Sequence, residues 1–128
     1  MNIILASEEE ELSSALSFQL RDHGIQSLLC CTDKDLEFAL NRADSLLLLI
    51  EHGFFGFSAL EISAKIQKSG DVLPMVFLTS RPTETEKREI LESGAIACLD
   101  WNISLRDLGV RIYEVLIQNH PSFLDCTA

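Results

Sequence analysis

The chain has 128 residues, of which 47% are hydrophobic, and its formal net charge at pH 7 is −10. These values are typical of one globular domain with a full core, and the negative charge argues against direct binding to nucleic acid or to an anionic membrane. No apolar run approaches the roughly 20 residues that span a bilayer, and the first residues lack the basic segment of a signal peptide, so we expect a cytoplasmic protein.

Five short apolar runs alternate with five amphipathic segments. We predict buried strands at 2–6, 25–30, 46–51, 75–78 and 95–99. We predict helices at 8–23, 33–41, 59–69, 84–93 and 105–119. Short connections between alternating elements predict an α/β domain of (βα)5 type, with a doubly wound five-stranded parallel sheet. The domain is expected to cover residues 1–120, and residues 121–128 are expected to be a tail or the start of a linker.

Hydroxyl residues stand before several of the predicted helices. The candidate N-caps are Ser7, Thr32, Ser58 and Ser104. Glu10 and Glu61 follow Ser7 and Ser58 at the spacing of a capping box. In the first helix, the 3.6-residue period predicts that Leu12, Ala15, Leu16 and Leu20 face the core.

The four cysteines predict reduced thiols. Cys30 and Cys31 are adjacent, whereas Cys98 and Cys126 are isolated. Adjacent cysteines rarely pair with each other, and the sequence has no C-x-x-C spacing. We therefore expect thiols that act as small hydrophobes in the core, with zinc or a structural disulfide as the alternative. The three histidines are scattered, and we assign none of them a catalytic or metal-binding role.

The run from Leu46 to Ile50 is apolar throughout and ends at Glu51. An unbroken apolar run suits a strand that is buried on both faces of a parallel sheet. Ligands of such sheets bind beyond the carboxyl ends of the strands. Glu51 is therefore the first candidate for a functional residue.

In this order the segments resemble a response-regulator receiver domain, a flavodoxin-like fold with strand order 2-1-3-4-5. The resemblance covers residues 2–119 and rests on motifs at 3–9, 46–51, 56–61, 74–80 and 93–95. Receivers carry a strand and a pair of acids at the first motif, and a phospho-accepting aspartate at the end of the second. The fourth matches the strand that ends in a switch hydroxyl, here Thr79. The loop after the third strand departs from the family in having Phe55 where a proline is usual.

The residues that carry receiver chemistry are altered. The resemblance places Glu51 at the nucleophile position, Ser7 and Glu8 at the acid pair, and Trp101 at the lysine position. The extra methylene of Glu51 moves its carboxylate away from the aspartate position. Loss of one acid weakens a site for Mg²⁺, which demands near-ideal octahedral geometry. An indole supplies no cation to neutralise a phosphoryl group.

Thr79 keeps its expected type, whereas Cys98 stands at the aromatic switch position. Glu51 either imitates a phosphorylated aspartate and holds Thr79 by a hydrogen bond, or is a solvated acid at a strand end. Glu8, Glu9 and Glu51 are weak candidates for metal ligands, although a glutamate run is also typical of a helix N-terminus. We expect no cofactor, with Mg²⁺ only under the alternative function below. Trp101 is expected to cover the altered pocket.

Two surfaces are candidates for protein contacts. In the last helix a core-facing stripe is predicted at Leu105, Leu108, Ile112, Val115 and Leu116. Val110, Tyr113 and Ile117 add apolar surface on another side, and receivers commonly dimerise through their fourth helix, fifth strand and fifth helix. The loop 54–57 carries three phenylalanines, of which one is expected at a partner surface and the others over the pocket. The resemblance implies a homodimer, a histidine kinase or an output domain as partner.

These features predict a pseudo-receiver that is not an enzyme and acts as a phosphorylation-independent protein–protein interaction or dimerisation module. The alternative is a working receiver that takes a phosphoryl group on Glu51 or a neighbouring carboxylate with Mg²⁺. A flavodoxin-like enzyme or flavin carrier is disfavoured, because the first strand is followed by Ser7 and four glutamates instead of a glycine-rich phosphate cradle.

Overall fold

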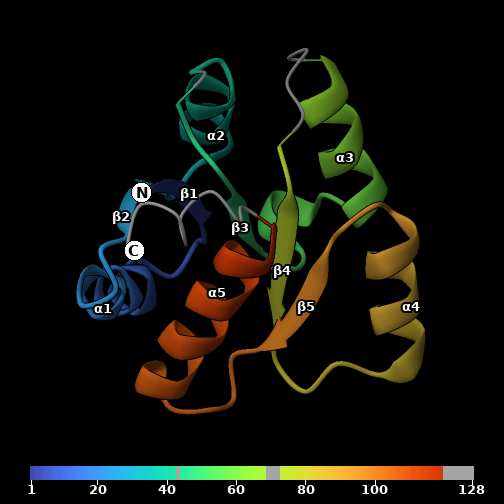
Figure 1. Cartoon of the computed structure of the whole chain (residues 1–128). Coiled ribbons are helices and arrows are strands. Elements are labelled where there is room, and N and C mark those ends of the chain that lie inside the picture. The colour runs from blue at the N-terminus through green and yellow to red at the C-terminus, as the bar shows by residue number, and fades with distance from the viewer. Residues whose placement is uncertain (43, 69–72, 120–128) are drawn as a thin grey trace.

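The structure, a computed structural model, describes residues 1–42, 44–68 and 73–119. Five parallel strands form one sheet in the order β2-β1-β3-β4-β5 (Figure 1). The strands are β1 (Asn2–Ala6), β2 (Gln26–Cys30), β3 (Leu48–Glu51), β4 (Met75–Thr79) and β5 (Ala97–Asp100). This confirms the predicted fold class and strand order. The predicted end of the third helix at residues 69–70, His120 and the tail 121–128 lie outside the described residues.

Helices cover both faces of the sheet. They are α1 (Glu10–Arg21), α2 (Asp33–Leu40), α3 (Ala59–Lys68), α4 (Glu84–Glu92) and α5 (Leu105–Asn119), with a short 3-10 helix η1 (Phe54–Gly56) after β3. α1 and α5 lie on one face, and α2, α3 and α4 lie on the other (Figure 1). Each face has its own apolar core, because alternate residues of each strand point to opposite faces. In β3, for example, Ile50 packs with the α2–α4 side and Leu49 with the α1–α5 side. None of the described helices combines the length and the apolar character that crossing a membrane requires.

Three of the four predicted N-caps are confirmed. The hydroxyls of Thr32, Ser58 and Ser104 accept backbone N–H groups three residues later, each at 3.1 Å. The Glu61 carboxylate returns the bond to Ser58 N–H and completes a capping box. A second capping box joins Thr83 and Glu86 at the start of α4.

The start of α1 differs from the prediction. The helix begins at Glu10 with Glu9 as its N-cap residue, and no side chain caps it. The Ser7 hydroxyl instead accepts the N–H of Glu9, only two residues on, so the expected Ser7–Glu10 capping box is wrong. The inner face of the helix is also rotated: Ala15 is exposed, while Ser13 and Ser17 are buried with Leu16 and Leu20.

α1 and α5 pack closely. A Cβ atom on Gly109 of α5 would lie 3.2 Å from Gln19 Cγ of α1, so a larger residue at this position requires the Gln19 side chain to shift. One turn further along α5, the Tyr113 ring stacks on His23 at the end of α1, with a distance of 5.2 Å between ring centroids. Tyr113 therefore contributes to the packing between these two helices.

Candidate functional site

The carboxyl ends of β1, β3, β4 and β5 bring the candidate residues to one edge of the sheet. Ala6 of β1 is in register with Ile50 of β3, so Ser7 and Glu51 follow at neighbouring strand ends. Glu51 is in register with Leu78, and Thr79 with Asp100. The order of parallel strands thus assembles these positions from four separate parts of the chain.

Ser7 and Glu51 form a direct pair. The Ser7 hydroxyl is fully buried and donates a hydrogen bond to Glu51 Oε2 at 3.2 Å. The same hydroxyl accepts the N–H of Glu9 at 3.1 Å. Within the described residues Glu51 makes no hydrogen bond to Thr79, so the structure does not have the contact that imitation of a phosphorylated aspartate requires.

The pKa of the Glu51 carboxyl is raised. Its main cause is desolvation at the half-buried strand end. Hydrogen bonds from the Ser7 hydroxyl and the Glu8 backbone oppose this shift, and the nearby charges of Glu9 and Glu8 add to it. The lysine of a receiver would favour the charged form here, and Trp101 provides no such cation.

Glu8, the one acid kept from the acid pair, is engaged with the chain itself. Its Oε2 accepts the backbone N–H of Phe55 at 3.2 Å, across 47 residues of sequence. Phe55 has φ of 50°, in the left-handed region that side chains larger than glycine rarely adopt. The Glu8 carboxylate therefore stabilises the strained loop after β3.

The residues at these strand ends do not fit a bound Mg²⁺ ion. Of the two positions predicted for the acid pair, Ser7 has no carboxylate and donates to Glu51, and Glu8 bonds to Phe55. Across the described part of the chain, no three His, Cys, Asp or Glu side chains are placed so that they could hold a metal ion. The proposed function below therefore includes no step through a metal.

A second acid anchors the loop after β4. Asp100 Oδ1 accepts the N–H of Arg81 at 3.2 Å and that of Asn102 at 2.8 Å. These backbone hydrogen bonds, that from Asn102 most of all, hold the pKa of Asp100 below its usual range. Arg81 also adopts the left-handed region, with φ of 47°. Thr79 is buried beside this junction, and its carbonyl accepts the N–H of Trp101 at 2.9 Å.

The side chains of Trp101 and Cys98 pack on opposite faces of the sheet. Trp101 is half-buried and packs with the α1–α5 core, so part of its ring serves that core. Whether it also covers the pocket stays a prediction. Cys98 packs with the α2–α4 core, and burial raises the pKa of its thiol.

The described cysteines, Cys30, Cys31 and Cys98, are free thiols, and Cys126 lies outside the described residues. Burial raises the pKa of Cys30 to about 12 and also raises that of Cys31. The thiol form is therefore favoured, as expected for small hydrophobes. Only Cys30 is fully buried, however, since Cys31 and Cys98 are half-buried.

The three loop phenylalanines have different environments. Phe54 is fully buried in the α2–α4 core, and Phe57 packs against that core with Lys65 Nζ 4.5 Å from its ring centroid. Phe55 is 41% exposed and rests edge-on against Phe54. Phe55 is thus the ring available for a partner.

In α5 the predicted stripe is confirmed at its centre: Leu108, Ile112 and Leu116 are buried, and Leu105 and Val115 are half-buried against the α1–α5 core. The other three apolar residues do not form one free face. Val110 is 38% exposed and Ile117 is half-buried, whereas Tyr113 stacks on His23.

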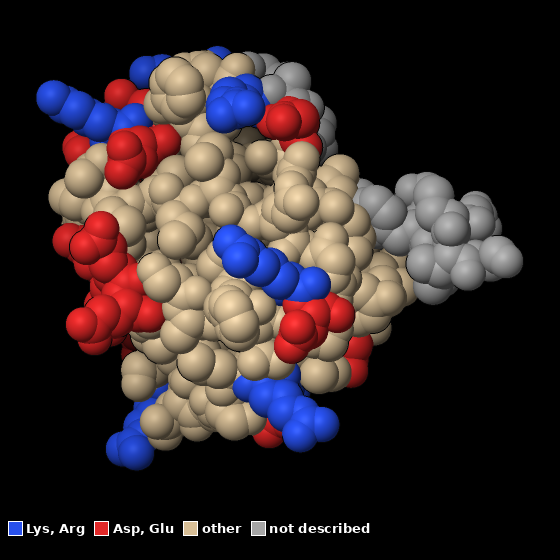
Figure 2. All heavy atoms as spheres, turned by 90° about the vertical axis from the view of Figure 1, so that its left-hand side faces the viewer, with Lys and Arg blue, Asp and Glu red and all other residues tan. Residues whose placement is uncertain are grey.

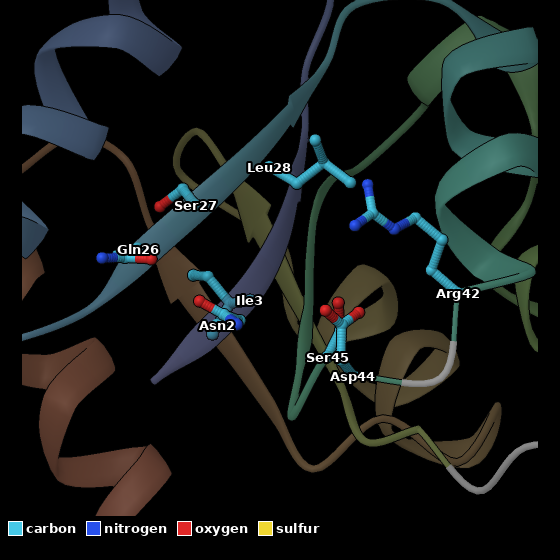
Figure 3. A pocket seen from close by; sticks show the side chains of 8 residues that line it. All are labelled: Asn2, Ile3, Gln26, Ser27, Leu28, Arg42, Asp44 and Ser45. Atoms are coloured by element: carbon cyan, nitrogen blue, oxygen red, sulfur yellow. The ribbon is translucent and has the colours of Figure 1, made fainter.

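A separate hollow of about 260 Å³ lies at the opposite end of the sheet. It is lined by Asn2 and Ile3 of β1, residues 26–28 of β2, and Arg42, Asp44 and Ser45 (Figure 3). The first two groups lie in the amino-terminal parts of β1 and β2, and the last three residues lie between α2 and β3. The hollow is therefore distinct from the Ser7–Glu51 site.

No family model matches the chain. Its sequence is 26% identical over 115 residues to the sensory transduction protein RegX3 of Mycobacterium tuberculosis, covering 90% of this chain and 50% of that protein. The RegX3 protein of Mycolicibacterium smegmatis is 25% identical over 115 residues, which again cover 90% of this chain and 50% of that protein. The chain thus spans about half the length of the curated relatives it matches.

Solved structures of response regulators share the fold. The structure of HP1043, an orphan response regulator of H. pylori, has a TM-score of 0.77 at 19% identity and covers 91% of this chain and 96% of that one. An atypical orphan response regulator, described as revealing a phosphorylation-independent regulatory mechanism, has a TM-score of 0.74 at 19% identity, covering 91% and 95%. At these identities the likeness establishes the fold.

Proposed function

We propose that this chain, which has the fold of a response-regulator receiver domain, is a pseudo-receiver of the cytoplasm that works as a phosphorylation-independent protein–protein interaction or dimerisation module. It would hold one conformation of the loops after β3 and β4 without a phosphoryl group. Its signal would pass by contact with a partner protein, and not by an enzymatic reaction. The similarity to a sensory transduction protein and to solved response regulators supports a protein partner such as a histidine kinase or an output domain.

One observation carries this proposal: each loop at the site is held by the protein's own carboxylates. Glu8 binds the N–H of Phe55, and Asp100 binds the N–H of Arg81. Both of these loop residues have left-handed backbone conformations that need support from their surroundings. Receivers use their acids for a metal and a phosphoryl group, whereas here Glu8 is used to fix a loop.

The atypical orphan neighbour supports the same proposal, because a phosphorylation-independent mechanism has been described for that protein. The changed side chains agree with it. Glu51 is paired with Ser7 at 3.2 Å, and the lysine position holds the half-buried Trp101. A phosphoryl group at Glu51 would therefore find no lysine at that position to neutralise its charge.

The dimer surface that we propose is made by α4, β5 and α5. Exposed aliphatic side chains on or beside these elements are Leu91, Ile96, Ile103 and Val110, with exposed fractions between 37% and 51%. Hollows beside them are lined by both basic and acidic residues, among them Arg111 and Asp107. Mixed charge around apolar side chains is the composition of a protein interface.

The phosphorylation question is tested by adding Mg²⁺ with beryllofluoride or a small acyl phosphate to the purified chain. We expect no change in the thermal midpoint or in the tryptophan fluorescence, because the acid pair and the lysine are altered. A phospho-accepting receiver is treated in parallel as the positive control. A rise in the midpoint that requires both Mg²⁺ and beryllofluoride would establish the alternative, in which Glu51 or a neighbouring carboxylate accepts the phosphoryl group.

Dimerisation is tested by light scattering over a range of protein concentrations. Val110→Glu is expected to shift the chain to monomer, because it places a charge within the proposed apolar contact. Phe18→Glu is the matched control, since Phe18 is 70% exposed on α1, away from this surface. A wild-type chain that is monomeric at every concentration would remove the dimerisation part of the proposal.

A further inference from the structure

A groove between α3 and α4 shares no lining residue with the Ser7–Glu51 pair or with the two hollows beside the proposed dimer surface. Its volume is about 440 Å³. It is lined by His52, by Ser58, Ala59 and Leu60 at the start of α3, and by Glu89, Glu92 and Ser93 at the end of α4. We call it the α3–α4 groove. It has space for one large side chain from another molecule.

The α3 wall of the groove is apolar. Leu60 is 69% exposed, while Ala59 next to it is buried. An exposed leucine on its own is ordinary, but one at the mouth of a concave space is placed to contact a ligand. His52, which also lines the groove, contacts α4. Its Nδ1 lies 3.6 Å from Glu86 Oε2, so this contact links the end of β3 to α4.

The α4 wall is acidic, and its charges are not balanced within the domain. Among the described residues neither Glu89 nor Glu92 has an ion-pair partner. Glu61, the nearby acid of α3, is used in the cap of its own helix. Covering unpaired carboxylates with an uncharged molecule costs free energy through desolvation. A molecule that fills this groove must therefore bring cations to Glu89 and Glu92.

We propose that the α3–α4 groove binds a segment of a partner protein in which one large apolar side chain is flanked by lysines or arginines. The apolar side chain contacts Leu60 and Ala59, and the cations pair with Glu89 and Glu92. The inference names a partner chemistry for the interaction module and in that sense rests on the proposed function. Helix α4 contributes to both surfaces, but the residues that line the groove differ from Leu91, Ile96, Ile103 and Val110 of the proposed dimer surface.

The test uses a short fluorescent peptide in which one tryptophan is flanked on each side by lysine pairs, with binding followed by fluorescence anisotropy. We expect saturable binding that weakens as salt is added. Leu60→Gln should lower the affinity by about tenfold, since it removes much of the apolar contact of one leucine. The double variant Glu89→Gln and Glu92→Gln should weaken binding and remove most of its salt dependence.

Matched controls separate the groove from general attraction to an acidic domain. Phe18→Gln changes an equally exposed apolar residue of α1. On the side of the molecule that α1 and β2 occupy, acidic side chains gather along one edge, and separate basic side chains lie on a mainly uncharged surface (Figure 2). Glu11→Gln with Glu114→Gln removes two exposed charges elsewhere. Both controls are expected to bind the peptide as the wild type does. Absence of saturable binding, or equal weakening by Leu60→Gln and Phe18→Gln, would overturn the proposal.

The peptide measurement is repeated with Val110→Glu, whose effect on dimerisation is read by light scattering. Unchanged peptide binding by this variant is expected, because Val110 lies on α5 and does not line the groove. A wild type that dimerises without binding the peptide contradicts the groove alone. A wild type that binds the peptide but never dimerises contradicts only the dimerisation part of the function.

Discussion

Ser7 stands at a position that the resemblance predicts for a receiver acid, and its hydroxyl has two partners. It donates to Glu51 and accepts the N–H of Glu9, while the residue itself has no exposed surface. A buried hydroxyl with both functions satisfied stabilises the strand ends, and removing it leaves the Glu9 N–H without its acceptor. The serine is thus part of the structure of the site.

Ser7→Ala is expected to lower the free energy of unfolding by about 1–2 kcal/mol, the usual cost of leaving a buried polar partner unsatisfied. Urea denaturation followed by circular dichroism measures this loss. Ser14→Ala is the control, because Ser14 is exposed on α1, and it should have little effect. Equal losses in the two variants would show that the Ser7 hydrogen bonds contribute nothing.

The raised pKa of Glu51 predicts that the free energy of unfolding depends on pH. Because its pKa is raised in the folded state, the folded chain holds this proton to higher pH than the unfolded chain does. The stabilising contribution is therefore present at low pH and is lost as pH rises from the unfolded pKa through the folded pKa. Glu51→Gln removes this titration, so its stability relative to wild type should increase across that window.

Urea denaturation of wild type and Glu51→Gln at several pH values from 4 upward measures the difference. Using the difference cancels the other acids, including Glu86 and Asp100, whose pKa values are lowered. A stability difference that is constant with pH would mean that Glu51 titrates alike in the folded and unfolded chains. A difference that falls with pH would indicate a lowered pKa and a nearby cation.

Sequence reasoning located Glu51 because it ends an apolar run, and it located Ser7 and Thr79 through the resemblance to receiver domains. It did not find the bond from Phe55 to Glu8 or the role of Asp100, since these pair a carboxylate with the backbone of a distant loop. Backbone N–H groups are present at almost every residue and give no sequence signal. Phe55 and Arg81, which donate two of these hydrogen bonds, have left-handed backbone conformations in the structure. Phenylalanine and arginine rarely adopt this conformation, so their residue types do not predict it.

At the scale of elements, the loop after β4 is positioned by β5. Asp100 joins Arg81 in one loop to Asn102 in the next, so one carboxylate sets where α4 begins relative to α5. The Thr83–Glu86 capping box then starts α4, and His52 contacts Glu86 from the β3 side. The position of α4 therefore depends on contacts from two neighbouring strands.

Asp100→Ala should release the loop after β4. We expect faster amide hydrogen exchange at Arg81 and Asn102, and a lower thermal midpoint at neutral pH, because two hydrogen bonds lose their acceptor. The pKa of Asp100 is lowered, so in the wild type this stabilisation exists above the unfolded pKa and is lost as pH falls through the folded pKa. Glu114→Ala, which removes an exposed acid in the middle of α5, is the control.

Unchanged exchange at the two amides in Asp100→Ala would contradict the anchoring role of this residue. Exchange that increases across all of α4 and α5 would instead indicate general destabilisation, and the Glu114→Ala data show how much of that arises from loss of charge alone. If Asp100 anchors these loops, faster amide exchange in Asp100→Ala is confined to the loops after β4 and β5, because only these segments open locally.

The starts of α2, α3 and α5 show where the local sequence is enough to predict a helix cap. Thr32, Ser58 and Ser104 cap their helices as their spacing predicts, because each hydroxyl has no competing partner. Ser7 has the same local pattern, but its hydroxyl donates to Glu51, 44 residues away, and accepts the N–H of Glu9 in place of that of Glu10. The expected capping box is therefore not formed, and α1 starts later and with a rotated inner face.

At the scale of the whole molecule, the fold class follows from alternation, whereas the strand order is predicted from the resemblance to receiver domains. Five apolar runs separated by five amphipathic segments leave few topologies once right-handed crossovers are required. The surface could be predicted less well: Tyr113 and Val110 lie close on one helical period, but α1 covers Tyr113 through His23 and leaves Val110 exposed. Which side of a helix meets a second helix depends on packing between distant segments, including the close approach at Gly109.

The positions that differ from the receiver pattern, Ser7, Glu51 and Trp101, lie at the ends of three strands, so under the proposed function the loss of phosphoryl capture is a property of the assembled sheet. Glu51→Asp alone should give no response to Mg²⁺ and beryllofluoride, because Ser7 and Trp101 still leave the ion without its second acid and the phosphoryl mimic without its cation. The triple variant Ser7→Asp, Glu51→Asp and Trp101→Lys should respond. Its carboxylates repel one another without metal, so its own stability will be lower.

A ligand at a concentration of about a hundred times its dissociation constant stabilises the folded state by about 2.7 kcal/mol. For a domain of this size this raises the thermal midpoint by about 5–10 °C. Comparing each variant with and without ligand removes the effect of its lower starting stability. A response of the triple variant alone means that the fold still supports phosphoryl capture and that side chains at three strand ends abolished it. A response of the wild type or of Glu51→Asp would mean that the site never lost this chemistry.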